Sequence, residues 1–79
     1  MKRKKKITSG DFTSAVLRVE YNRERLQEFE QGTEMLAYYI PDLKLTREEE
    51  SVLEGIQSRL YNLIKADETI ILNYHKQQS

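Results

Sequence analysis

The sequence predicts an all-α fold in which two long helices form an antiparallel hairpin, and three observations lead to it. Apolar residues recur at steps of three, four and seven over two long segments. A short connector with the only proline of the chain separates these segments, and a strong helix start signal opens the second. The chain has 79 residues, 38% of them hydrophobic and 33% charged, which is typical of one small soluble helical domain.

The first helix is expected over residues 11–39, after turn and capping residues at 8–11. Its apolar stripe consists of Phe12, Val16, Val19, Leu26, Phe29, Leu36 and Ile40. The stripe keeps its phase across Gly32, which favours one long helix over two short ones. Glycine inside a helix costs about 1 kcal/mol relative to alanine, so a three-helix bundle broken at Gly32 is the alternative. Pro41 ends the segment because it cannot donate a backbone hydrogen bond.

The second helix is expected from Arg47 to Tyr74 or His75. It opens with a capping box, in which the Thr46 hydroxyl accepts from the Glu49 amide and the Glu49 carboxylate accepts from the Thr46 amide. A heptad seam typical of coiled coils follows, at Leu53, Ile56, Leu60, Leu63, Asp67, Ile70 and Tyr74. Two helices of nearly equal length joined by a short connector pack side by side and antiparallel.

The predicted organisation has three parts. Residues 1–10 form a basic flexible tail, residues 11–76 form the helical hairpin domain, and residues 77–79 form a frayed C-terminus. Beyond the run of lysines, no internal repeat or low-complexity segment divides the chain further.

Asp67 interrupts the apolar seam of the second helix. Setting Leu36 opposite Glu50 aligns the two stripes along most of their length and places Val19 opposite Asp67. Arg23, one turn from Val19, is then the nearest basic residue, and an Arg23–Asp67 pair would fix the register more than it would add stability. The alternative is a seam wide enough for both side chains to reach water.

A two-helix hairpin buries only one seam, yet further apolar residues flank it on both helices. These are Leu17, Tyr21, Met35, Tyr38, Tyr39, Val52, Tyr61, Ile64 and Ile71. We therefore expect a homodimer that forms a four-helix bundle, because one partner helix cannot cover this surface. The residues predicted to hold the assembly are Val19, Leu26, Leu36, Leu53, Ile56, Leu60, Leu63 and Ile70. Coverage by another protein is the alternative.

The net charge of zero hides a partition along the chain. Residues 1–9 contain five basic residues and no acid, and all 13 acids follow in residues 10–79. The basic residues are Lys2, Arg3, Lys4, Lys5 and Lys6. A lysine arm can contact phosphates without reading sequence, so nucleic-acid binding through it is the alternative function. Contact with anionic lipid or an acidic partner, a nuclear import signal and a solvated terminus are further interpretations.

Two features of the first helix predict a surface for another protein. Glu20, Glu24 and Glu28 recur at every fourth position and form an acidic stripe on one face. Tyr38 and Tyr39 lie near the end of the same helix, and tyrosine suits sites where one end of the ring is buried and the other wet. The alternative is a solvated acidic face and a pair of tyrosines at the rim of the core.

Residues with catalytic chemistry are almost absent. The chain has no cysteine, and its one histidine, His75, has no acid at the spacing of a triad or a ligand set. No glycine-rich loop, Ser-His-Asp set or Glu-x-x-His pair occurs. The sequence thus predicts no catalytic residue, cofactor or metal, and favours a non-enzymatic regulator, adaptor or inhibitor. No apolar run approaches the about 20 residues of a membrane span or follows the lysines as in a secretory signal, so the expected location is the cytoplasm.

Overall fold

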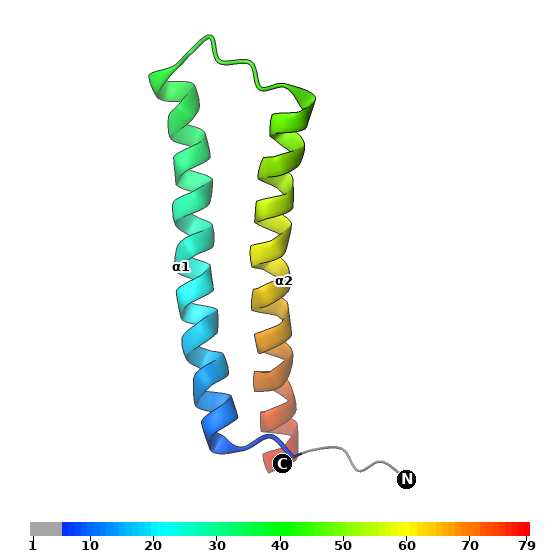
Figure 1. Cartoon of the computed structure of the whole chain (residues 1–79). Helices are drawn as coiled ribbons and strands as arrows, with labels where there is room; N and C mark the ends of the chain where they lie inside the picture. The colour runs from blue at the N-terminus through cyan, green and yellow to red at the C-terminus, as the bar shows by residue number, and fades with distance from the viewer. Residues whose placement is uncertain (1–5) are drawn as a thin grey trace.

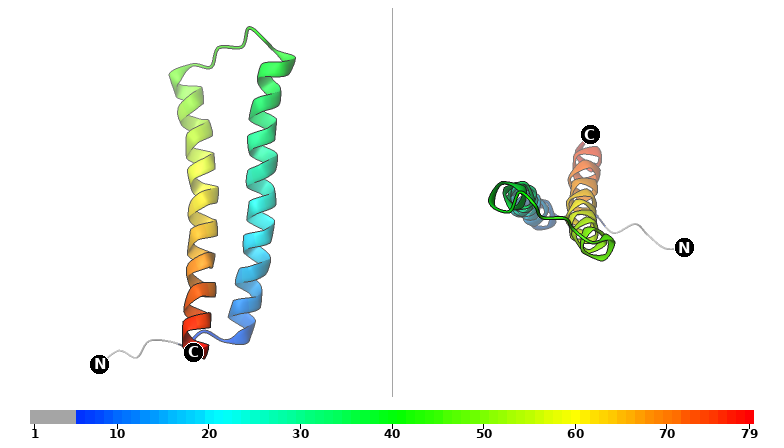
Figure 2. Two further views of the ribbon diagram at one scale, coloured as in Figure 1. Left: turned by 180° about the vertical axis from the view of Figure 1, so that it is seen from behind. Right: turned by 90° about the horizontal axis from the view of Figure 1, so that it is seen from above.

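The computed structural model describes residues 6–79, which form two α-helices, α1 (Ser9–Tyr39) and α2 (Arg47–Gln78). The helices lie side by side and antiparallel, with the connector at one end and the start of α1 beside the end of α2 at the other (Figures 1 and 2). They pack against each other, and no strand occurs in the described part of the chain. The predicted all-α hairpin is confirmed.

Helix α1 runs unbroken across Gly32, so the three-helix alternative is wrong. A Cβ atom at Gly32 would meet no atom within 4 Å, so this position faces open space and does not require glycine for close packing. The helix begins two residues before the predicted position 11, because Thr8 caps it. The Asp11 amide donates to Thr8 Oγ1 at 3.0 Å, and the Thr8 amide donates to Asp11 Oδ2 at 3.2 Å.

Helix α2 begins with the predicted capping box. The Glu49 amide donates to Thr46 Oγ1 at 3.1 Å, and the Thr46 amide donates to Glu49 Oε1 at 3.0 Å. Hydrogen bonding of the Glu49 carboxylate to Thr46, chiefly to its backbone amide and then to its side chain, holds the pKa of Glu49 below its ordinary value. The helix continues to Gln78, beyond the predicted end at His75, and basic side chains in its last turn complement the helix dipole.

The core between the helices is small. Its buried cluster consists of Val19, Leu26 and Ile64, with Leu60 and Ile71 packed against it. Ala15 and Asp67 are the other buried residues of the described chain. All of these lie away from the connector, whereas Leu36 and Leu43 beside the connector each remain 38% exposed. The hairpin is therefore packed best in the half that contains the start of α1 and the end of α2.

The contact face of α1 follows the predicted stripe from Phe12 to Phe29, whereas its last two members, Leu36 and Ile40, are exposed. The register is the predicted one. Phe12 and Tyr74 stack with ring centroids 4.5 Å apart, as the alignment requires. On α2 the contact face is rotated slightly from the predicted seam. Its members, all buried or half-buried, are Leu53, Gln57, Leu60, Ile64, Asp67, Ile71 and Tyr74.

Two of the predicted seam residues of α2 are thus misplaced by one position. Ile56 and Leu63 are 43% and 47% exposed, and Gln57 and Ile64 take their places. At the third such position, the predicted seam residue Ile70 and its neighbour Ile71 on the contact face are both half-buried. The physical reason is polar: Gln57 Nε2 donates to Glu30 Oε2 at 3.0 Å, and this bond forms only when Gln57 faces α1.

Candidate interaction surfaces

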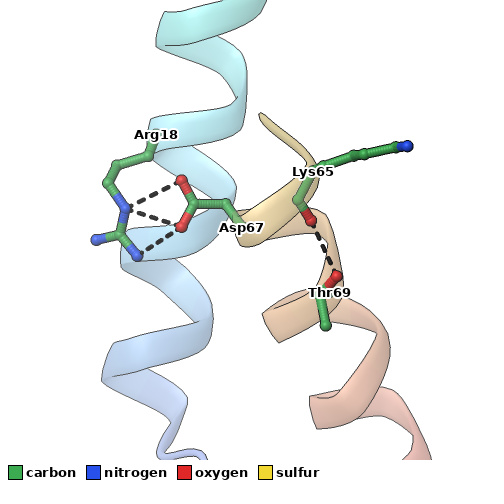
Figure 3. A network of polar contacts seen from close by, with 4 residues as sticks. All are labelled: Arg18, Lys65, Asp67 and Thr69. Atoms are coloured by element: carbon green, nitrogen blue, oxygen red, sulfur yellow. Dashed lines mark hydrogen bonds and ion pairs between the residues drawn. The ribbon is translucent and has the colours of Figure 1, made fainter. Parts of the chain in front are cut away.

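The polar contact that crosses the core is an ion pair between Arg18 and Asp67 (Figure 3). Arg18 Nε donates to both carboxylate oxygens at 3.1 and 3.2 Å, and Nη2 donates to Oδ1 at 3.0 Å. The Asp67 side chain is 10% exposed and that of Arg18 is 51% exposed, so the pair reaches from the core to the surface. Hydrogen bonding to Asp67 raises the pKa of Arg18 above its ordinary value. Nearby, the Thr69 hydroxyl donates to the Lys65 carbonyl along α2.

The predicted Arg23–Asp67 pair is wrong, because Arg23 pairs with Glu68 instead. The buried positions Ala15 and Val19 define the side of α1 that faces α2. Helix geometry then places Arg18 and Arg23 on opposite borders of that face. Each arginine reaches the acid on its own side of the hairpin, and Asp67 lies on the side of Arg18.

At the end opposite the connector, aromatic and amide groups join the two helices. His75 lies edge-on to Phe12, with ring centroids 5.4 Å apart, beside the Phe12–Tyr74 stack. The Gln77 side chain accepts from the Ile7 amide at 3.0 Å and donates to the Ile7 carbonyl at 2.6 Å. These two bonds fix the residue before the α1 cap against the last turn of α2.

The predicted partner-binding residues are all exposed on α1, and Glu20 among them lines a hollow between the helices together with Ile71 and His75 of α2. Glu20, Glu24 and Glu28 are exposed, and Tyr38 and Tyr39 are 75% and 70% exposed with their rings edge to face at 5.4 Å. From Glu20 to Tyr39 the surface extends about 28 Å at 1.5 Å per residue. Whether it binds another protein stays a prediction.

Apolar side chains border the acidic stripe (Glu20, Glu24, Glu28) at both ends. They are Leu17, Tyr21 and Met35, with exposed fractions of 60%, 58% and 43%. These three were predicted to flank the seam, but the structure places them on the outer side of α1. Arg25 lies over the Tyr21 ring at 4.8 Å and also approaches Glu28, so one cation partly neutralises the stripe.

The residues predicted to hold the assembly divide into two groups. Val19, Leu26, Leu53 and Leu60 are buried or half-buried between α1 and α2 of one chain. Leu36, Ile56 and Leu63 are exposed and Ile70 is half-buried. The second group is therefore available to a partner, and the first group is engaged within the hairpin.

Of the residues predicted to contact nucleic acid, Lys6 lies at the start of the described chain and is exposed. Lys2, Arg3, Lys4 and Lys5 lie outside the described residues.

Two of the open hollows between the helices lie near opposite ends of the hairpin. One, of about 480 Å³, lies beside the connector and is lined by Leu36, Leu45, Glu48, Glu49, Val52 and Leu53. The other, of about 420 Å³, lies near the opposite end and is lined mainly by apolar side chains of Val16, Val19, Ile71 and Leu72.

Within residues 6–79 no group of His, Cys, Asp and Glu side chains is arranged to hold a metal ion. No described helix is long and apolar enough to cross a membrane. Comparison with known protein families, with curated proteins and with solved structures finds no match for this chain.

Sequence reasoning missed Arg18, Gln57 and Gln77, although each makes a contact between segments distant in sequence. For Arg18 a signal existed, because it borders the stripe at Val19 as closely as Arg23 does. Periodicity offers no comparable signal for the two glutamines. Neutral amides carry little weight in an apolar pattern, and their partners are a glutamate and a backbone peptide group.

Proposed function

We propose that this chain is a non-enzymatic interaction module that self-associates as a four-helix bundle and acts on another macromolecule as a regulator, adaptor or inhibitor in the cytoplasm. The observation that carries the proposal is the mismatch between what the hairpin buries and what it exposes. Four apolar residues of the described chain are buried, namely Ala15, Val19, Leu26 and Ile64. Thirteen large hydrophobic side chains of residues 6–79 are exposed, among them Leu17, Val52, Ile56, Leu63 and Leu72.

The dimensions of the chain support the same proposal. The radius of gyration is 17.7 Å, whereas a compact domain of this length has about 12 Å. Small helical proteins with thin cores gain stability by oligomerising, and pairing two hairpins would cover the exposed stripes.

The test of self-association is light scattering coupled to size exclusion, at low and high salt. We expect a mass near twice the chain mass of 9.4 kDa. Salt should change it little, because apolar contacts are not screened as ion pairs are. A monomer at every accessible concentration would contradict the proposal, and a dimer that dissociates in high salt would show that charges hold it.

A second candidate function, nucleic-acid binding by the basic arm, is favoured by the partition of charge along the sequence. Five cations precede position 7, and every acid lies beyond it. Five phosphate contacts would give a log–log salt slope of about −4 to −5 on duplex DNA. We expect deletion of residues 1–9 to remove such binding, measured by fluorescence anisotropy with a labelled duplex. Absence of binding by the whole chain at low salt would refute this function.

A further inference from the structure

Helix α2 carries a second apolar stripe next to the one that packs on α1. We call it the free stripe, and it consists of Val52, Ile56, Leu63 and Ile70. The first three are 61%, 43% and 47% exposed, and Ile70 is half-buried. Arg59 and Ala66 fill the intervening positions, which gives steps of four, three, four, three and four residues. This is the spacing of a coiled-coil seam, and α1 does not cover it.

We propose that the free stripe binds the free stripe of a second copy of this chain, with the two α2 helices antiparallel. The inference rests on the proposed self-association and specifies the face and the orientation. Its first support is exposure: Val52, Ile56 and Leu63 remain 61%, 43% and 47% exposed in the hairpin, although their spacing is that of a seam that packs against another helix.

The order of side chains along the free stripe supports the antiparallel orientation. In an antiparallel coiled coil, each layer pairs an a position of one helix with a d position of the other. Setting Val52 opposite Ile70 of the second copy also sets Ile56 opposite Ala66 and Arg59 opposite Leu63 of the second copy. The two-fold axis then passes near residue 61, close to the middle of Arg47–Gln78, so the helices overlap along nearly their whole length.

Arg59 argues against the parallel orientation. It is exposed and forms no ion pair with a described residue. In a parallel, in-register pair it would face Arg59 of the second copy, which places like charges in one layer and is unfavourable. In the antiparallel pair its aliphatic stem lies on Leu63 of the second copy while the guanidinium reaches water.

The charges beside the free stripe are also complementary in this register. Glu48 in the first turn of α2 and Lys76 in the last turn are both exposed, and neither forms an ion pair with a described residue. They occupy g positions of the heptad pattern. Antiparallel pairing brings Glu48 of each copy to Lys76 of the other, which gives two equivalent ion pairs related by the two-fold axis.

The first experiment compares Leu63→Glu with Leu72→Glu by sedimentation equilibrium of the whole chain. Both residues are exposed leucines of α2, at 47% and 54%, but Leu72 lies on the opposite flank. Each dimer buries two copies of Leu63, so the charge should weaken dimerisation by about 100-fold or more. Leu72→Glu should leave it within about threefold. Circular dichroism must show retained helicity in both variants, because neither leucine belongs to the hairpin core.

The outcomes separate this inference from the proposed function. A wild type that is monomeric at every concentration overturns both, and leaves the free stripe to another protein. A dimeric wild type with a dimeric Leu63→Glu variant overturns only the choice of face. Equal losses in both variants overturn it as well. Loss in Leu63→Glu alone, with helicity retained, supports it.

Register and orientation have their own test. Glu48→Lys and Lys76→Glu should each weaken dimerisation about 3- to 10-fold, because each creates two like-charge contacts across the interface. The double variant should regain wild-type affinity, since the pair is restored with the signs exchanged. Unchanged affinity in both single variants, or losses that add in the double variant, would overturn the antiparallel register.

Discussion

Replacing Arg18 by alanine tests the polar contact at the centre of the hairpin. Three N–H···O contacts between 3.0 and 3.2 Å join Arg18 to Asp67, and Asp67 is 7% exposed. Removing the guanidinium leaves a buried carboxylate without these donors. Breaking a fully buried ion pair costs about 3–5 kcal/mol. The Arg18 side chain is 51% exposed, so water replaces part of the lost interaction and we expect a loss of about 1–2 kcal/mol.

The assay is urea unfolding followed by circular dichroism at pH 7 and one fixed chain concentration, because the proposed self-association would make the midpoint depend on concentration. Arg23→Ala is the matched control. It removes an ion pair with Glu68 in which the two side chains are 62% and 44% exposed. The free energy of unfolding should therefore fall by no more than about 1 kcal/mol. Asp67→Leu should be neutral or stabilising, since it replaces the buried charge by an apolar side chain beside Ile64.

Equal effects of Arg18→Ala and Arg23→Ala would refute this reasoning. That result would mean that water solvates Asp67 in the hairpin and that the ion pair contributes no more than a surface contact. A strongly destabilising effect of Asp67→Leu would refute the expectation that this substitution is neutral or stabilising. It would show that the Arg18–Asp67 pair adds net stability as well as fixing the register.

Three further predictions concern the helices themselves. Gly32→Ala and Gly55→Ala should each stabilise the fold by about 0.5–1 kcal/mol in thermal unfolding, because a Cβ at either position meets no atom within 4 Å; destabilisation would indicate a break in the helix. The pKa of Glu49 is lowered in the folded state by Thr46, so its contribution is present above the unfolded pKa and is lost as the pH falls through the lower folded value. Stability between pH 5 and 3 should therefore fall less in Glu49→Gln than in the wild type, and parallel curves would contradict this. Leu26→Ala, at a core position 8% exposed, should cost about 2–4 kcal/mol in urea unfolding, and a loss below about 1 kcal/mol would show that Leu26 is not in the core.

The ends and the continuity of the helices follow from local chemistry, and the sequence predicted most of them correctly. Thr46 and Glu49 carry the capping box within four residues, and their bonds form as predicted. The unbroken course through Gly32 was predictable because the apolar stripe keeps its phase there. The register was predictable because matching two stripes of similar length leaves few alternatives, and the Phe12–Tyr74 stack agrees with it.

The rotation of α2 about its own axis was not predictable from hydrophobic periodicity. The adjacent pairs Leu63–Ile64 and Ile70–Ile71 supply two neighbouring stripes that fit the same heptad spacing, so the pattern alone does not distinguish them. The choice between the two stripes depends on polar partners from α1. Which partner is available depends on the side of α1 from which each polar side chain projects. Hydrophobic periodicity along the sequence does not contain that information.

The doubling of the apolar stripe on α2 gives the two stripes separate roles. Ile64 packs in the hairpin core, whereas its neighbour Leu63 stays 47% exposed. A sequence under pressure only to fold as a monomeric hairpin would gain nothing from leucine at an exposed position, where a polar residue improves solubility. In the proposed dimer, covering of the free stripe would take place on a face of α2 adjacent to the hairpin core, so it would be a step distinct from folding of the hairpin. Because the hairpin core alone is small, dimerisation would then add to the stability of the hairpin, and the two steps would be thermodynamically coupled.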